Sequence, residues 1–100
     1  MTIDELRKRI DELDERLVAL LNERASCALE IGTLKRAVGA EVYQPDREAE
    51  VLHHVQSHGR QMGSPLGGDA IVRVFERIID EARRLERLAD GEADSLDPHN

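Results

Sequence analysis

Between Ile3 and Val38 the sequence carries apolar residues at alternating steps of three and four, and no proline interrupts them. This spacing places apolar side chains along one face of a helix, in a heptad-like pattern. The members of this face are Ile3, Leu6, Ile10, Leu13, Leu17, Leu20, Cys27, Ile31, Leu34 and Val38. We therefore predict one helix over residues 3–38, with Gly39 at its C-terminal end.

This helix is too long for a compact monomer. At 1.5 Å per residue it would extend about 54 Å. A compact domain of this size has a radius of gyration of only about 13 Å. The remaining residues could not cover the whole apolar face, so the sequence predicts an intimate dimer.

Two shorter helices are predicted in the rest of the chain. Pro45 suits the first turn of a helix over residues 45–58, with Gln44 near its cap. Glycines, a serine and a proline predict a loop over residues 59–68. Asp69 is placed to cap a third helix over residues 70–89, whose apolar face comprises Ile71, Val74, Phe75, Ile78, Ile79, Ala82 and Leu85.

The predicted fold class is thus all-α, with three helices per chain in one domain of residues 1–89. Residues 90–100 are polar, and we predict a disordered tail. The chain has 21 Asp and Glu against 14 Lys and Arg, a net charge of −7. Acidic chains are poor partners for nucleic acids and anionic membranes, and no stretch of about 20 apolar residues is present.

The chain carries a single cysteine, Cys27, and its first residues lack the apolar core of a signal peptide. Both features fit a reducing compartment, and we expect a cytoplasmic protein. His54 and His58 have the i, i+4 spacing of helical zinc ligands, but no third ligand is placed beside them. We predict no metal and no cofactor, and we assign Cys27 to the core.

Position 24 of the long apolar face is an arginine. Lys35 follows Arg24 by eleven residues, about three helical turns, and so lies on the same face. Cations on an apolar face need an anion, which a substrate could supply. The alternatives are a polar residue that sets the register of a coiled coil, and a salt bridge to Glu48 or Glu86. Spacing alone leaves these interpretations open.

Arg7 precedes Arg24 by seventeen residues and faces about 100° away from it on the same helix. One helix cannot direct both side chains at one ligand. Two antiparallel copies could, if Arg7 reached the site of the other chain. On spacing alone, a solvated arginine is the better interpretation of Arg7.

Further polar residues stand at the ends of the shorter helices. Arg47 and Glu48 open the second helix, just after the loop that follows Lys35. Glu86 lies one turn after Ala82, at the end of the third helix's apolar face. Carboxylates near partly buried cations suggest a polar pocket. The alternative for Glu86 is an ion pair with Arg83 or a solvated position.

Five segments resemble the all-helical, type II chorismate mutases found as domains of bacterial P-proteins. In chain order they read LRKRIDELD (6–14), LLNER (20–24), EIGTLK (30–35), YQPDRE (43–48) and VFERII (74–79). Each segment is weakly specific, whereas the ordered set is highly specific. The resemblance covers about residues 3–88 and implies an entwined homodimer with two active sites.

The resemblance also implies how chorismate binds. Arg24 and Arg47, with Arg7 from the second chain, would hold the two carboxylates of the substrate. Lys35 would contact a carboxylate and the ether oxygen.

Four more positions follow from the same resemblance. Glu48 would bind the ring hydroxyl, and Glu86 stands where the family places Gln or Glu against the ether oxygen. Gln44 replaces an aspartate that is common before the proline, so only its backbone amide is expected to serve the hydroxyl. Ala82 stands where some members have a serine near a carboxylate, so one hydrogen bond is expected to be missing or replaced.

The activity implied is the intramolecular Claisen rearrangement of chorismate to prephenate, an isomerase step of phenylalanine and tyrosine biosynthesis. It requires no nucleophile, metal or cofactor. The resemblance also raises the possibility of activation by a partner enzyme of the shikimate pathway. Two alternatives remain: an isochorismate pyruvate-lyase with a similar fold and pocket, and a non-enzymatic helical dimerisation or regulatory module.

Overall fold

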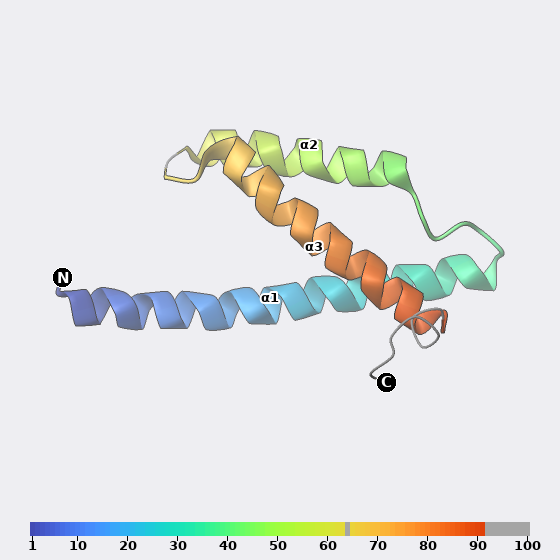
Figure 1. Ribbon diagram of the computed structural model, residues 1–100, viewed down its shortest axis with the longest axis horizontal. Helices are drawn as coiled ribbons and strands as arrows, with labels where there is room; N and C mark the ends of the chain where they lie inside the picture. Colours follow the sequence, from blue (N-terminus) through green and yellow to red (C-terminus); the bar gives the residue numbers. More distant parts are fainter. Residues whose placement is uncertain (64, 92–100) are drawn as a thin grey trace.

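The computed structural model describes residues 1–63 and 65–91 and contains helices but no strand over these residues. Its elements are α1 (Ile3–Ala37), α2 (Pro45–Met62) and α3 (Gly67–Ala89), arranged as in Figure 1. The predicted all-α class, with three helices and a very long first one, is confirmed. Most of the predicted tail, residues 92–100, lies outside the described residues.

Local capping explains where α1 begins and ends. The Thr2 hydroxyl accepts a hydrogen bond from the Glu5 amide at 3.1 Å, which satisfies one free N–H of the first turn. At the other end Gly39 has a φ of +71°, its amide donates to the Arg36 carbonyl, and the Ala40 amide donates to the Lys35 carbonyl. This is a Schellman motif, and it ends α1 one residue before the predicted position.

The boundary between α2 and α3 differs from the prediction. The helix beginning at Pro45 continues through Gly59 to Met62, and α3 begins at Gly67, so the connection is much shorter than the predicted loop over residues 59–68. Asp69 is not the cap of α3. It lies inside the first turn and accepts a hydrogen bond from the Gln56 side chain at 3.2 Å.

Glycine contacts explain this difference. Gly59 and Gly68 are both buried where α2 and α3 meet. A Cβ atom on Gly59 would lie 3.2 Å from the Gly68 Cα, and one on Gly68 would lie 2.8 Å from the Gln56 carbonyl oxygen. The glycines therefore allow the two backbones to approach closely, and this packing outweighs the helix-breaking tendency of Gly59.

α3 is the central helix, because it contacts both α1 and α2. In Figure 1 it runs diagonally from the far end of α2 to the C-terminal half of α1. Ile79 of α3 is the one buried hydrophobic side chain of the described residues, with 6% exposure. Most other large apolar side chains of α2 and α3 are half-buried, whereas Met62, Val74 and Leu88 are exposed. The sequence had placed Val74 on the apolar face of α3.

The N-terminal part of α1 has no cover within the described residues of the chain. Every residue from Met1 to Glu23 is exposed, including Ile10 at 55% and Leu17 at 55%. The radius of gyration is 16.9 Å, against about 13 Å for a compact domain of this length. The apolar face predicted from the sequence is therefore present, and its first half is exposed to solvent. Over residues 1–63 and 65–91, no helix is both long enough and apolar enough to span a bilayer.

We predict that Gly68→Ala lowers the free energy of unfolding by roughly 1–3 kcal/mol, because the new methyl group meets backbone that must move. The matched control is Gly32→Ala in α1, whose Cβ would meet only the end of the Arg36 side chain, at 3.2 Å. Higher helix propensity should make this control neutral, or stabilising by up to about 1 kcal/mol. Denaturant unfolding followed by circular dichroism measures both, and equal stability of Gly68→Ala and wild type would contradict the close approach.

Candidate active site

A cavity of about 300 Å³ lies where α3 crosses the C-terminal half of α1, beside the beginning of α2. All three helices and the segment between α1 and α2 contribute to it. Its lining residues are Arg24, Cys27, Ala28, Ile31, Lys35, Val42, Gln44, Arg47, Glu48, Val51, Ile79, Ala82, Arg83 and Glu86. Seven of the eight substrate-binding positions predicted from the sequence are in this set, and Arg7 is the exception.

α1 supplies two half-buried cations, Arg24 and Lys35. The Arg24 guanidinium lies over the ring of Phe75 from α3, with its Cζ atom 5.9 Å from the ring centroid, a distance suited to a cation–π contact. Within residues 1–63 and 65–91, neither cation forms an ion pair. The alternative in which Arg24 or Lys35 is neutralised by Glu48 or Glu86 is therefore wrong, and both charges are available in the cavity.

α2 places its first turn at the cavity. Gln44 is the N-cap residue and makes no capping hydrogen bond with its side chain. Arg47 is exposed and pairs with Glu50 at 3.4 Å, with both side chains about two-thirds exposed. Exposed pairs of this kind contribute at most about 1 kcal/mol, so a dianionic ligand could compete for Arg47.

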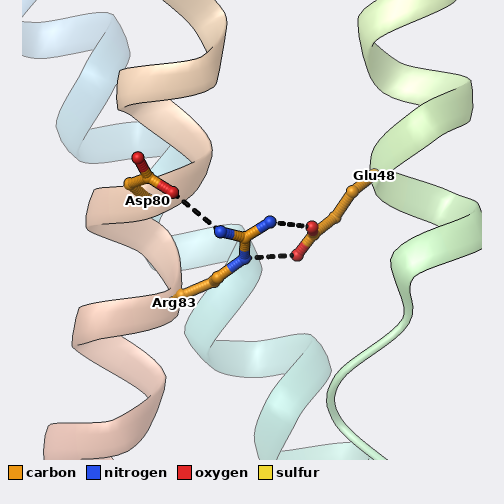
Figure 2. A network of polar contacts seen from close by, with 3 residues as sticks. All are labelled: Glu48, Asp80 and Arg83. Atoms are coloured by element: carbon orange, nitrogen blue, oxygen red, sulfur yellow. Dashed lines mark hydrogen bonds and ion pairs between the residues drawn. The ribbon is translucent and has the colours of Figure 1, made fainter.

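Glu48 is held by Arg83 of α3 (Figure 2). Arg83 Nε donates to Glu48 Oε2 at 2.9 Å, and Nη2 donates to Oε1. The hydrogen bond from Arg83 lowers the pKa of the Glu48 carboxyl against the opposing effect of its partial burial. Glu48 is therefore ionised and acts as a hydrogen-bond acceptor.

Arg83 was not predicted as a site residue from the sequence and was considered only as a partner for Glu86. The structure pairs it with Glu48 instead. A signal was available, because Arg83 follows Ile79 by four residues and precedes Glu86 by three. These are the spacings of one helix face.

Glu86 behaves in the opposite way to Glu48. It is half-buried, and burial raises the pKa of its carboxyl. Arg36 and Lys35 of α1 act against this shift, while Asp90 and Glu48 add to it through charge repulsion. Arg36 is itself paired with Asp90 at 3.0 Å. The sequence left the direction open between burial and Lys35, and in the structure burial dominates.

The cavity contains four cationic side chains and two carboxyl groups, and one of those carboxylates is already paired with Arg83. Such a balance favours a small ligand with two negative charges. Within the described ranges, no group of three His, Cys, Asp or Glu side chains gathers to hold a metal ion. The arrangement can bind carboxylates and stabilise developing negative charge, and the raised pKa of Glu86 keeps its protonated form present to higher pH than for an ordinary glutamate.

The other predicted side chains lie elsewhere or differ in environment. Arg7 is exposed and stands roughly 25 Å from Arg24 along α1, at 1.5 Å per residue. Cys27 is exposed and lines the cavity, so its assignment to the core was wrong for the single chain. His54 and His58 are exposed on α2.

Residues 6–87 match the family described as chorismate mutase type II. The chain is 39% identical over 87 residues to a bifunctional chorismate mutase/prephenate dehydratase of Stutzerimonas stutzeri, covering 82% of the chain and 23% of that relative. It is 41% identical over 90 residues to an enzyme of the same name from Neisseria gonorrhoeae, covering 86% and 24%. The chain thus spans about a quarter of the length of these relatives.

A solved structure of a chorismate mutase, form II, from Thermus thermophilus superimposes with a TM-score of 0.78. The two chains are 30% identical, and the match covers 85% of this chain and 93% of the other. The likeness therefore extends over nearly the whole length of a solved protein.

Proposed function

Because the chain belongs to the chorismate mutase type II family, we propose that it rearranges chorismate to prephenate in phenylalanine and tyrosine biosynthesis. The observation that carries this proposal is one cavity, on this fold, where Arg24, Lys35 and Glu86 come together. The non-enzymatic alternative gives no reason for two cations on the apolar face of α1 that form no ion pair with any described residue.

The chemistry asks little of the protein beyond binding and electrostatics. In chorismate one ether C–O bond breaks and one C–C bond forms within the same molecule, so no atom leaves and no co-reactant enters. The protein must select the compact conformer and stabilise the negative charge that develops on the ether oxygen. A millionfold acceleration corresponds to about 8 kcal/mol, which two or three preorganised contacts of roughly 3 kcal/mol each would supply.

We assign the carboxylates of the substrate to arginines, since a guanidinium binds a carboxylate with two parallel hydrogen bonds. Arg24 and Arg47 approach the cavity from different helices, as two separate carboxylates require. Lys35 and protonated Glu86 would donate to the ether oxygen. Ionised Glu48 would accept from the ring hydroxyl, while substrate contacts at Gln44 and Ala82 remain predictions.

We further propose that two chains form an entwined homodimer. The first half of α1 exposes a continuous row of large apolar side chains, and a second copy is the partner that offers a matching row. In an antiparallel arrangement Arg7 of one chain would reach the cavity of the other. Prephenate dehydratase is the second activity named for the relatives, which is in line with a partner enzyme. Activation by an enzyme of the shikimate pathway stays a prediction.

The first test is Arg24→Ala, assayed with chorismate and with identification of the product. Removing a carboxylate anchor should lower kcat/KM at least about a hundredfold, equivalent to about 2.7 kcal/mol. The control is Arg77→Ala, which removes an exposed arginine that pairs with Glu81 outside the cavity. Equal turnover by Arg24→Ala and wild type would refute the role of Arg24. Pyruvate formed from isochorismate, without prephenate from chorismate, would favour the lyase alternative.

Sharing of residues between chains is tested by mixing two inactive variants. Arg7→Ala and Arg24→Ala chains are refolded together, so that each heterodimer contains one site that lacks both arginines and one intact site. Each heterodimer should have about half the activity of a wild-type dimer, because both substitutions affect the same one of its two sites. Analytical ultracentrifugation verifies the dimers. Confirmed heterodimers without activity would show that Arg7 does not act across the interface.

The protonation of Glu86 gives a pH dependence. Its raised pKa keeps the protonated donor present to higher pH than for an ordinary glutamate. Ionised glutamate only accepts hydrogen bonds and would repel the ether oxygen. We therefore expect kcat/KM to fall as the pH rises through the pKa of Glu86 in the folded protein.

Glu86→Gln supplies a permanent donor of similar shape, so its profile should be flatter, with activity retained at neutral pH and above. Rates measured from about pH 4 to 9 on both proteins make the comparison. A flat wild-type profile, together with a Gln variant that is slow throughout, would mean that Glu86 acts as an anion.

A further inference from the structure

We propose that Arg83 is a positioning residue, which holds the Glu48 carboxylate in the orientation that receives the ring hydroxyl of the substrate. The inference rests on the proposed function, since it concerns the same cavity. It goes further by giving a role to a residue whose contact with Glu48 is the principal ion pair between α2 and α3 at the cavity.

The geometry fixes Arg83 from two sides (Figure 2). Its Nε and Nη2 atoms donate to the two oxygens of Glu48, and Nη1 donates to Asp80 Oδ1 at 2.7 Å. All three nitrogens of the guanidinium thus have a carboxylate partner. Asp80 lies one turn before Arg83 on α3, so it anchors the guanidinium to its own helix. The Nε and Nη2 donors, which we call the fork, reach across to Glu48 on α2.

The fork leaves Glu48 able to bind substrate. An ionised carboxylate has about four acceptor positions, and the fork occupies one on each oxygen. The remaining positions can accept the hydrogen bond of a hydroxyl in the cavity that Glu48 lines. Arg83 therefore does not need to release Glu48 when substrate binds.

The surroundings leave space into which Glu48 could move without the fork. Glu48, Arg83 and Glu86 line a second cavity of about 430 Å³, whose other walls are Val42, Tyr43, Arg87 and Asp90. The Arg83–Glu48 pair thus stands between two open spaces. A Glu48 side chain freed from Arg83 could turn into the second cavity, away from the site.

Charge gives a second reason for the fork. Glu48 shares its cavity with Arg24 and Lys35, neither of which has an ion-pair partner within the described residues. If an unheld Glu48 carboxylate turned toward these cations instead of into the second cavity, it would compete with the carboxylates of the substrate. By holding the ionised Glu48 carboxylate in an ion pair, Arg83 keeps both cations available for the ligand.

The test is a double-mutant cycle between Arg83 and Glu48, with Arg84→Met as control. Arg84 is exposed on α3, next to Arg83 in sequence, and lines neither of the two cavities. The ring hydroxyl does not change charge in the reaction, so losing its contact should act mainly on binding. We expect Arg83→Met to raise KM about tenfold and to change kcat less than about threefold.

Two further variants separate positioning from folding. Arg83→Lys keeps the charge but loses the fork, so it should give an intermediate KM. In a Glu48→Ala background, Arg83→Met should change KM less than about twofold, because there is no carboxylate left to position. Circular dichroism verifies that the variants are helical. If Arg83→Met does not fold, the KM of Arg83→Lys is compared with that of wild type instead.

The outcomes are distinguishable. A wild-type KM in both Arg83 variants overturns the inference, and so does an Arg83→Met effect that persists in full in the Glu48→Ala background. An active wild-type enzyme with either result leaves the proposed function standing. A wild-type protein that does not convert chorismate overturns the function and the inference together.

Discussion

The apolar face of α1 is longer than one chain can cover, and the rest of the structure depends on how this face is divided. α3 lies against its C-terminal part, where Gly32 is buried and where Arg24 and Lys35 line the cavity. The part before Arg24 is exposed throughout. Burial of apolar area is the main favourable term in folding. Ile79 is the one buried hydrophobic side chain among the described residues, so a single chain gains little from this term. The proposed dimer and the proposed site are therefore two uses of the same helix face.

The cavity has its size because α2 and α3 are fixed differently at their two ends. Near the short connection they touch through Gly59 and Gly68, and Figure 1 shows them diverging from there. At the open end the Arg83–Glu48 pair spans the gap between them. Close-packed backbones at one end and an ion pair between two long side chains at the other leave a wedge-shaped space, which Arg24 and Lys35 of α1 also line. A larger residue at either glycine would change the angle of this wedge and with it the cavity.

Periodicity predicted most of this fold and the shared face of Arg24 and Lys35, whereas the roles of the site residues came from the family resemblance. The steps of three and four placed Arg24 and Lys35 on one face correctly, because helical spacing is a local property. The predicted loop over residues 59–68 was wrong for a tertiary reason. Gly59 weakens an isolated helix, but in the folded chain it allows the approach of Gly68, and only the packed structure reveals that gain. Arg83 was missed for a similar reason, since its partner Glu48 lies 35 residues away.

The two carboxyl groups of the cavity are pushed in opposite directions by their surroundings, which suits two different tasks. Arg83 lowers the pKa of Glu48, and burial raises the pKa of Glu86. The two effects are coupled, because the negative charge of Glu48 itself adds to the upward shift at Glu86. An acceptor for the ring hydroxyl and a donor for the ether oxygen can therefore coexist at one pH, although both begin as the same kind of side chain.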